Sequence, residues 1–127
     1  MCIFTSSSGL TITVGENAKE NIEIRKNASQ KDLWFHLHKD PSPHAILELN
    51  DKEPTRDDIF DACQLVKYFS KRKNDRSAKV IYIKVKQVGK VIEKDGAVEL
   101  RSKPEIIDCY TDEESLERLL KTQKRKK

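Results

Sequence analysis

Hydrophobic positions recur with two different periods along the chain, which indicates a mixture of strands and helices. Leu10, Ile12 and Val14 alternate with threonines, and a period of two predicts a strand with one buried face. Comparable short runs predict strands at residues 2–5, 10–14, 32–37, 44–49, 79–85 and 106–107. Residues 88–91 and 95–97 contain glycine and are interpreted as turn or bulge.

Helical signals lie between these strands. Asn17 or Gly15 can cap a helix over residues 17–26, and residues 111–114 (Thr-Asp-Glu-Glu) form a capping-box pattern that opens a last helix through Leu120. Thr55 can cap a longer central helix. Its apolar residues recur at helical spacing and are expected to face the core: Ile59, Ala62, Cys63, Val66 and Phe69. This order predicts an α/β (α+β) fold, a single domain with a mixed, largely antiparallel sheet and about three helices.

Length and composition narrow the class of protein. A chain of 127 residues suits one domain, here assigned to residues 1–120, with 121–127 as a basic C-terminal tail. The longest apolar run, residues 80–83, is far too short to cross a membrane, and the N-terminus lacks the pattern of a signal peptide. The three cysteines are odd in number and far apart in the sequence, which favours a reducing, cytoplasmic location over a disulfide framework.

Charge is strongly segregated along the chain. Residues 67–90 hold one acid, Asp75, and nine bases: Lys67, Lys71, Arg72, Lys73, Arg76, Lys79, Lys84, Lys86 and Lys90. A one-signed surface of this kind attracts a polyanion, so these residues are candidates for nucleic-acid contact. The alternative is that they solvate a helix end and an edge strand. The same two interpretations apply to the tail, whose seven residues include five bases.

All three histidines and the single tryptophan lie within eleven residues: Trp34, His36, His38 and His44. On a strand, Trp34, His36 and His38 share one face, and residues 33, 35 and 37 share the other. If the second face is the core, the first presents a ring and imidazoles that can stack on bases and bond to phosphate or ribose. The alternative is a buried His36 bonded to a neighbouring strand and a Trp34 that fills the core.

Two chemical roles are possible for the imidazoles. A hairpin that joins His36 and His44 could make them a general acid–base pair for ester or phosphodiester cleavage. A zinc site is disfavoured, because the spacing of the histidines is unusual for zinc and no cysteine stands nearby. Phosphate-loop, dinucleotide and nucleophile-elbow motifs are absent from the sequence. We therefore expect no metal and no cofactor.

The sequence resembles a known family at residues 32–36 (Asp-Leu-Trp-Phe-His). A glycine and asparagines precede this motif, at residues 15–21, and a second histidine follows it at His44. This pattern is similar to the NFACT-R domain of ribosome quality-control proteins. It is closest to the stand-alone branch typified by coiled-coil-domain-containing protein 25, which begins with Phe-Thr-Ser-Ser-Ser as residues 4–8 do here. The chain departs from the pattern at Glu16, where the family often has lysine, and it lacks the long coiled coil of that branch.

The resemblance implies an RNA-binding module that acts on tRNA, peptidyl-tRNA or the large ribosomal subunit in translation quality control. A second hypothesis is an enzyme that releases peptidyl-tRNA or cuts RNA, with His36 and His44 as the catalytic pair. A third is an adaptor that binds DNA or docks a basic ribosomal protein. Its docking face would be the acids of residues 105–117, a stretch without any base. No membrane partner is expected.

Overall fold

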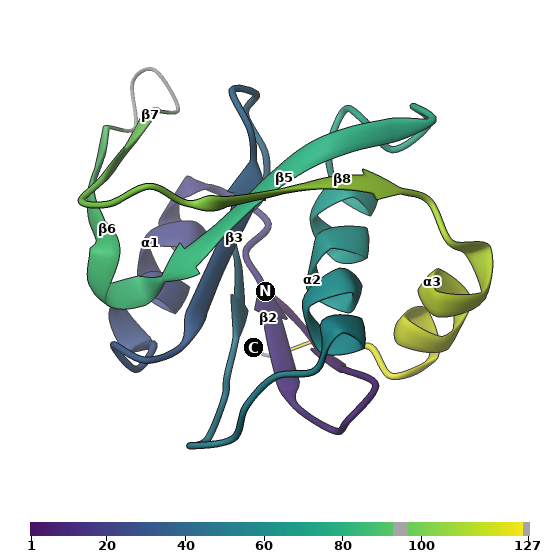
Figure 1. The fold of residues 1–127 in the computed structure, drawn as a ribbon. Helices are drawn as coiled ribbons and strands as arrows, with labels where there is room; N and C mark the ends of the chain where they lie inside the picture. The colour runs from purple at the N-terminus through teal and green to yellow at the C-terminus, as the bar shows by residue number, and fades with distance from the viewer. Residues whose placement is uncertain (93–96, 126–127) are drawn as a thin grey trace.

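A seven-stranded antiparallel sheet forms the body of the molecule (Figure 1). The computed structural model describes residues 1–92 and 97–125, with side chains for residues 1–89 and 99–125. The strand order is β8-β5-β3-β4-β2-β1-β9, so β4 is the middle strand and β3 lies beside it in the interior of the sheet. These strands are β1 (Cys2–Thr5), β2 (Thr11–Val14), β3 (Leu33–Leu37), β4 (Ala45–Leu47), β5 (Ser77–Lys84), β8 (Glu105–Tyr110) and β9 (Lys124–Arg125). Every pairing described is antiparallel, which confirms the predicted class.

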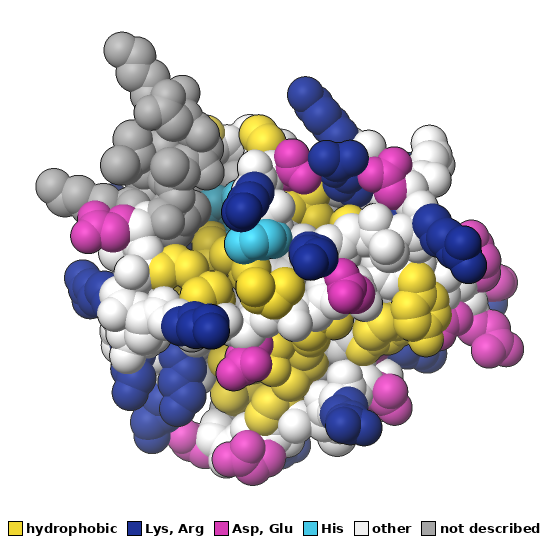
Figure 2. Space-filling view, turned by 45° about the horizontal axis from the view of Figure 1, so that its top comes forward, with side chains coloured by type: hydrophobic (Ala, Val, Ile, Leu, Met, Phe, Trp, Pro, Cys, Tyr) yellow, Lys and Arg dark blue, Asp and Glu magenta, His cyan; other side chains and the backbone are white. Residues whose placement is uncertain are grey.

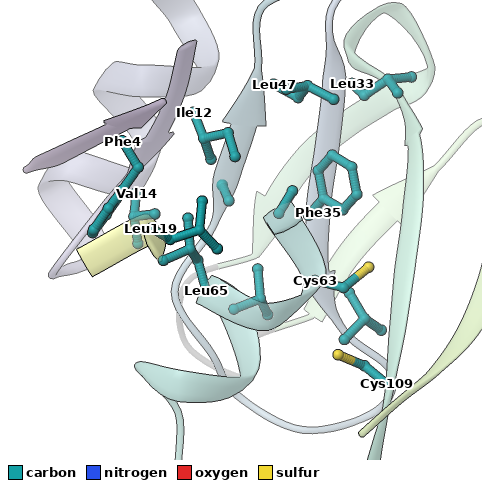
Figure 3. Packing of buried hydrophobic residues seen from close by; sticks show 14 of the residues in the cluster. Phe4, Ile12, Val14, Leu33, Phe35, Leu47, Cys63, Leu65, Cys109 and Leu119 are labelled. Atoms are coloured by element: carbon teal, nitrogen blue, oxygen red, sulfur yellow. The ribbon is translucent and has the colours of Figure 1, made fainter. Parts of the chain in front are cut away.

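The main core lies between one face of this sheet and α2 (Arg56–Tyr68), with α3 (Glu113–Lys121) closing one side. Phe35 from β3 and Leu65 from α2 are completely buried there, as is Leu119 from α3. Figure 3 shows these side chains pointing toward one another from the strands and helices. The alternation seen in the sequence therefore places its apolar positions on the α2 side of the sheet.

A second, smaller core covers the opposite face. Trp34 and Ile46 from the sheet pack with Ile24 of α1 (Ala18–Asn27) and with Val85 and Val88. Val85 lies in the short 3-10 helix η1 (Val85–Gln87), which leads into β6 (Val88–Ile92). Because both faces of β3 are covered, all five of its residues are buried.

Two parts of the structure differ from the sequence-based prediction. Residues 88–91, interpreted as turn or bulge, lie instead in β6, which pairs with β7 (Ala97–Leu100) through an irregular register. Of residues 95–97, interpreted in the same way, 95 and 96 lie outside the described residues, and Ala97 begins β7. A single glycine in a strand commonly marks such an irregularity, which hides the strand from pattern analysis. In the basic C-terminal segment, Lys124 and Arg125 pair with Ile3 and Cys2 of β1, so they extend the sheet.

The caps of the two larger helices agree with prediction, and the cap of the last helix does not. Asn17 caps α1, and Thr55 caps α2 in a full capping box with Asp58. Asp112 precedes α3, but its side chain makes no cap bond. The predicted box at residues 111–114 is wrong because Thr111 has another role: its hydroxyl oxygen accepts a 2.7 Å bond from the ammonium of Lys67.

A buried carboxylate fastens the β1–β2 turn to α2. Asp58 accepts bonds from the hydroxyls of Ser6 and Ser8 and from the backbone amides of Ser8 and Thr55, at 2.6–2.9 Å. Burial alone would raise the pKa of Asp58, but these donors outweigh it and hold that pKa well below its usual range. One turn along α2, Asp61 accepts bonds from Ser7 and from Arg118 of α3.

We predict that Asp58→Ala lowers the free energy of unfolding by about 3 kcal/mol, because it leaves buried donors without their charged acceptor. Urea unfolding at neutral pH measures this value. Asp57→Ala removes an exposed carboxylate one residue away and should cost less than about 1 kcal/mol. Equal losses in the two variants would contradict the role given to the buried network.

Candidate nucleic-acid interface

Trp34, His36 and His44 form a compact cluster on the α1 side of the sheet. The indole Nε1 of Trp34 donates to Nδ1 of His44 at 3.0 Å, and the Trp34 ring stacks on His36 with centroids 5.5 Å apart. The two imidazoles meet edge to face at 5.1 Å. All three side chains are buried, with Trp34 completely inaccessible, His36 7% exposed and His44 4% exposed. The expected open stacking face is therefore wrong for Trp34, because α1 and η1 cover it.

Helix α1 is held against this cluster by residues that flank the Asp-Leu-Trp-Phe-His motif of residues 32–36. The side-chain oxygen of Asn21 accepts a 3.1 Å bond from the His44 amide, and the His44 carbonyl accepts a 3.0 Å bond from the Gly15 amide. A Cβ on residue 15 would collide with the Asn21 side chain, so glycine is required by close approach rather than by an unusual backbone angle. The motif thus explains how the helix docks.

The electrostatics of the cluster disfavour acid–base catalysis. Burial lowers the pKa of His44 to about 3, with further lowering from His36 and Arg25. Burial also lowers the pKa of His36, and its Nδ1 lies 2.6 Å from the Leu37 carbonyl, which fixes that nitrogen as the donor. A general acid must carry a proton near neutral pH. Two buried neutral imidazoles suit a structural role instead.

The basic residues of the 67–90 segment do not form one patch. Lys71, Arg72, Lys73, Arg76 and Lys79 lie at one end of β5, and Lys84 and Lys86 lie at the other. About 17 Å of extended strand separates Lys79 from Lys84. Figure 2 shows one face of the molecule, on which Lys and Arg side chains are scattered with Asp and Glu side chains between them. The expectation of a single cationic surface is therefore wrong, because the extended strand β5 separates the two groups of basic residues.

Lys67 is not available to a ligand. It is only 1% exposed, and its ammonium donates to the Thr111 hydroxyl and to the Lys73 carbonyl at 3.1 Å. Its assignment to the binding surface is wrong, because it fastens α2 to the loop before α3. Lys90 lies in β6, and its side chain is outside the described residues.

The remaining cations favour one end of the molecule, which we call the loop end. It consists of the β3–β4 loop (residues 38–44) and the α2–β5 segment (residues 69–79). Its cations are Lys39, Lys71, Arg72, Lys73, Arg76 and Lys79, all exposed. Its acids, Asp40 and Asp75, both bind Arg72, at 3.0 and 3.1 Å. Among the described residues, no ion pair engages Lys39, Lys71, Arg76 or Lys79, which leaves this end positive.

His38 is the one predicted histidine of the loop end whose side chain is not buried, since His44 lies in the imidazole cluster. His38 is half-buried beside Lys79, Arg72 and Asp40, around a hollow of about 230 Å³. Lys73 lies 4.3 Å above the ring of Tyr68, so one cation is held in place by an aromatic face. The loop end thus carries a histidine and six cations on two adjoining segments.

The opposite end of β5 is balanced in charge. A hollow of about 840 Å³ there is lined by Lys31, Lys52, Lys84 and Lys86. The same hollow is lined by the acids Asp32, Glu48, Asp51 and Glu53, and Lys31 pairs with Asp51 at 3.8 Å. A polyanion gains less at such a surface than at the loop end.

The comparisons with known proteins agree with this architecture. The family model described as NFACT protein RNA binding domain matches residues 1–102. The chain belongs to this family. It is 35% identical over 88 residues to the Rqc2 homolog RqcH of Bacillus subtilis, and 33% identical over 89 residues to that of Streptococcus suis. These matches cover 68% of the chain but only 15–16% of each relative.

A solved structure shares the fold. It is the C-terminal part of the fibronectin/fibrinogen-binding protein from Streptococcus suis, with a TM-score of 0.80 and 25% identity. The match covers 92% of this chain and 47% of that one. Because the chain spans a small part of its curated relatives, family membership describes the domain and not the activity of the larger proteins.

Sequence reasoning named Asn21 only as part of the family pattern, and it gave Arg25 no role at the imidazole cluster. Asn21 bonds to the His44 backbone, and Arg25, one turn later on α1, is close enough to lower the pKa of His44. Their spacing of four residues places both on the same side of a helix, which is the signal that could have identified them. Within residues 1–92 and 97–125, no group of three His, Cys, Asp or Glu side chains could hold a metal ion, and no helix could span a membrane.

The buried imidazoles predict a specific dependence of stability on pH. An unfolded histidine gains a proton near pH 6.5, whereas folded His44 resists protonation down to about pH 3. Between these values the unfolded state binds more protons, so the free energy of unfolding should fall as the pH is lowered. His44→Gln removes one titrating group, and His36 remains. We expect a shallower fall for this variant between pH 7 and about pH 4.5, in urea unfolding at each pH. Identical pH profiles for the two proteins would contradict the assignment.

Proposed function

We propose that this domain binds folded RNA through the cations of the loop end, and that it does so in ribosome quality control. The observation that carries the proposal is the set of cations without ion-pair partners at the loop end, in a chain of the RNA-binding NFACT family. Phosphate contacts by Lys and Arg supply most of the affinity of such proteins for nucleic acid. His38 adds a group that can bond to phosphate or ribose beside them.

The proposed ligand is tRNA, peptidyl-tRNA or RNA of the large ribosomal subunit. Two relatives that contain a similar domain are named as Rqc2 homologs, and this is the support for the setting. Folded RNA presents phosphates and 2′-hydroxyls in a fixed shape, which suits a surface of separate cations on two loops. A cytoplasmic location is part of the same proposal, since translation takes place there.

Binding rather than cleavage is the activity that the geometry supports. The proposed catalytic pair, His36 and His44, lies in the second core, and burial lowers both pKa values. Its indole partner Trp34 completes a bonded cluster that needs no ligand. We therefore propose that these residues shape the sheet from which the two loops of the loop end project.

We predict that Lys71→Glu with Arg76→Glu weakens binding of tRNA by at least about tenfold at physiological salt. These two side chains are exposed and make no ion pair in the described structure. Arg72 is left unchanged because it holds Asp40 and Asp75. Fluorescence anisotropy over a salt series should also show a slope reduced by about 0.7–0.9 for each phosphate that the variant no longer neutralises.

The matched control is Lys84→Glu with Lys86→Glu, which makes the same change of charge at the balanced end. It should weaken binding by less than about threefold, through net charge alone. Unchanged melting temperatures would show that both variants fold. If the control pair causes the larger loss, the assignment to the loop end is wrong. Competition by duplex DNA shows whether the surface discriminates RNA, since phosphate contacts alone do not.

A further inference from the structure

A groove with an apolar floor lies on the side of the molecule formed by α2, β8 and α3. It has a volume of about 580 Å³. Its apolar lining comes from Ile59 and Phe60 of α2, Tyr82 of β5, and Ile107 and Tyr110 of β8. Phe60 and Tyr110 contact each other with ring centroids 5.4 Å apart, yet Tyr110 is 59% exposed. Exposed aromatic surface beside a groove is typical of an interaction site.

Acidic side chains surround this groove. Asp57, Asp108 and Asp112 line it, Glu113 follows Asp112 in the sequence, and Glu105 lies opposite Tyr82 in the β5–β8 pairing. No cation of the described residues forms an ion pair with any of these five, and Arg56 is the one described cation in the lining. The negative charge is therefore left for a ligand of opposite sign.

The groove also borders an edge of the sheet. β8 is the outermost strand next to β5, and among the described strands it has no partner on its other side. An extended peptide can use the free backbone groups of such an edge while its side chains enter neighbouring pockets. A basic peptide with apolar side chains fits all three features: its apolar side chains contact the floor, its cations pair with the acids, and its backbone bonds to the edge of β8.

We propose that this groove binds a lysine- or arginine-rich segment of a partner protein that also carries large apolar side chains. The surface adjoins the loop end, because Asp108 lies opposite Lys79 in the β5–β8 pairing. Its charge is opposite, however, and would repel RNA. The two surfaces allow the domain to hold RNA and a basic protein at the same time. The inference does not depend on RNA binding and can stand or fall separately from it.

The test uses nuclease-treated protein and a fluorescein-labelled synthetic peptide in which Lys and Leu alternate. Anisotropy should show saturable binding, and a peptide in which Lys and Gly alternate should bind at least about tenfold more weakly. Asp108→Lys and Tyr110→Ser should each weaken the Lys–Leu peptide about tenfold. Asp108→Asn, a smaller change of shape, should give an intermediate loss.

The matched control for charge is Glu23→Lys, an exposed acid on α1 with the same change of net charge. It should alter peptide affinity by less than about twofold. If Glu23→Lys and Asp108→Lys weaken the peptide equally, or if the Lys–Gly peptide binds as tightly, the groove is not a docking site and its acids only protect the edge strand. Lys71→Glu with Arg76→Glu adds negative charge and should not weaken peptide binding, which separates this result from failure of the RNA proposal.

Discussion

The burial of β3 on both faces is the constraint on which the rest of the structure depends. Phe35 packs into the α2 core, and Trp34 packs into the core covered by α1. A strand in this position has no surface to offer a ligand. Recognition therefore belongs to the loops at the strand ends and to the edge of the sheet. The positive loop end and the groove beside β8 are the two places where we propose that ligands bind.

The imidazole cluster shows how a polar group can be accommodated in such a core. Buried polar atoms need bonds. The Trp34–His44 bond satisfies the indole Nε1 and Nδ1 of His44, and the Leu37 carbonyl accepts from Nδ1 of His36. The His44 backbone is then tied to α1 through Asn21 and Gly15. The cluster of Trp34, His36 and His44, which in the sequence resembles a reactive site, thus connects α1 to the β3–β4 hairpin.

Much of the fold was accessible from the sequence because local patterns determine it. The alternation in β2 and the Thr55 cap were identified correctly, since both follow from the chemistry of neighbouring residues. The sequence allows both an exposed and a buried Trp34, because only the position of α1 decides between them. The assignment of Lys67 to the binding surface is wrong because the sequence shows the charge of this residue but not its burial. It follows Cys63 by four residues on a buried helix face, where its ammonium finds two oxygen acceptors.

The candidate site was harder to predict because it is assembled from segments that are distant in sequence. Segregation of charge along the chain identified candidate residue types and predicted one surface that contains both Lys71 and Lys84. In the structure, β5 separates these two residues. Lys39 was missed because it lies alone in the β3–β4 loop, and only the fold brings it to the α2–β5 segment. Local patterns therefore indicate a preference for polyanions, whereas tertiary structure decides where such a ligand can lie.

The location of the RNA surface is the central claim, and hydrogen–deuterium exchange of the protein with and without tRNA tests it most directly. Our account predicts slower exchange on binding in residues 38–44 and 69–79, with no change at residues 27–31 and 50–53 of the balanced end. Protection confined to residues 27–31 and 50–53 would contradict it.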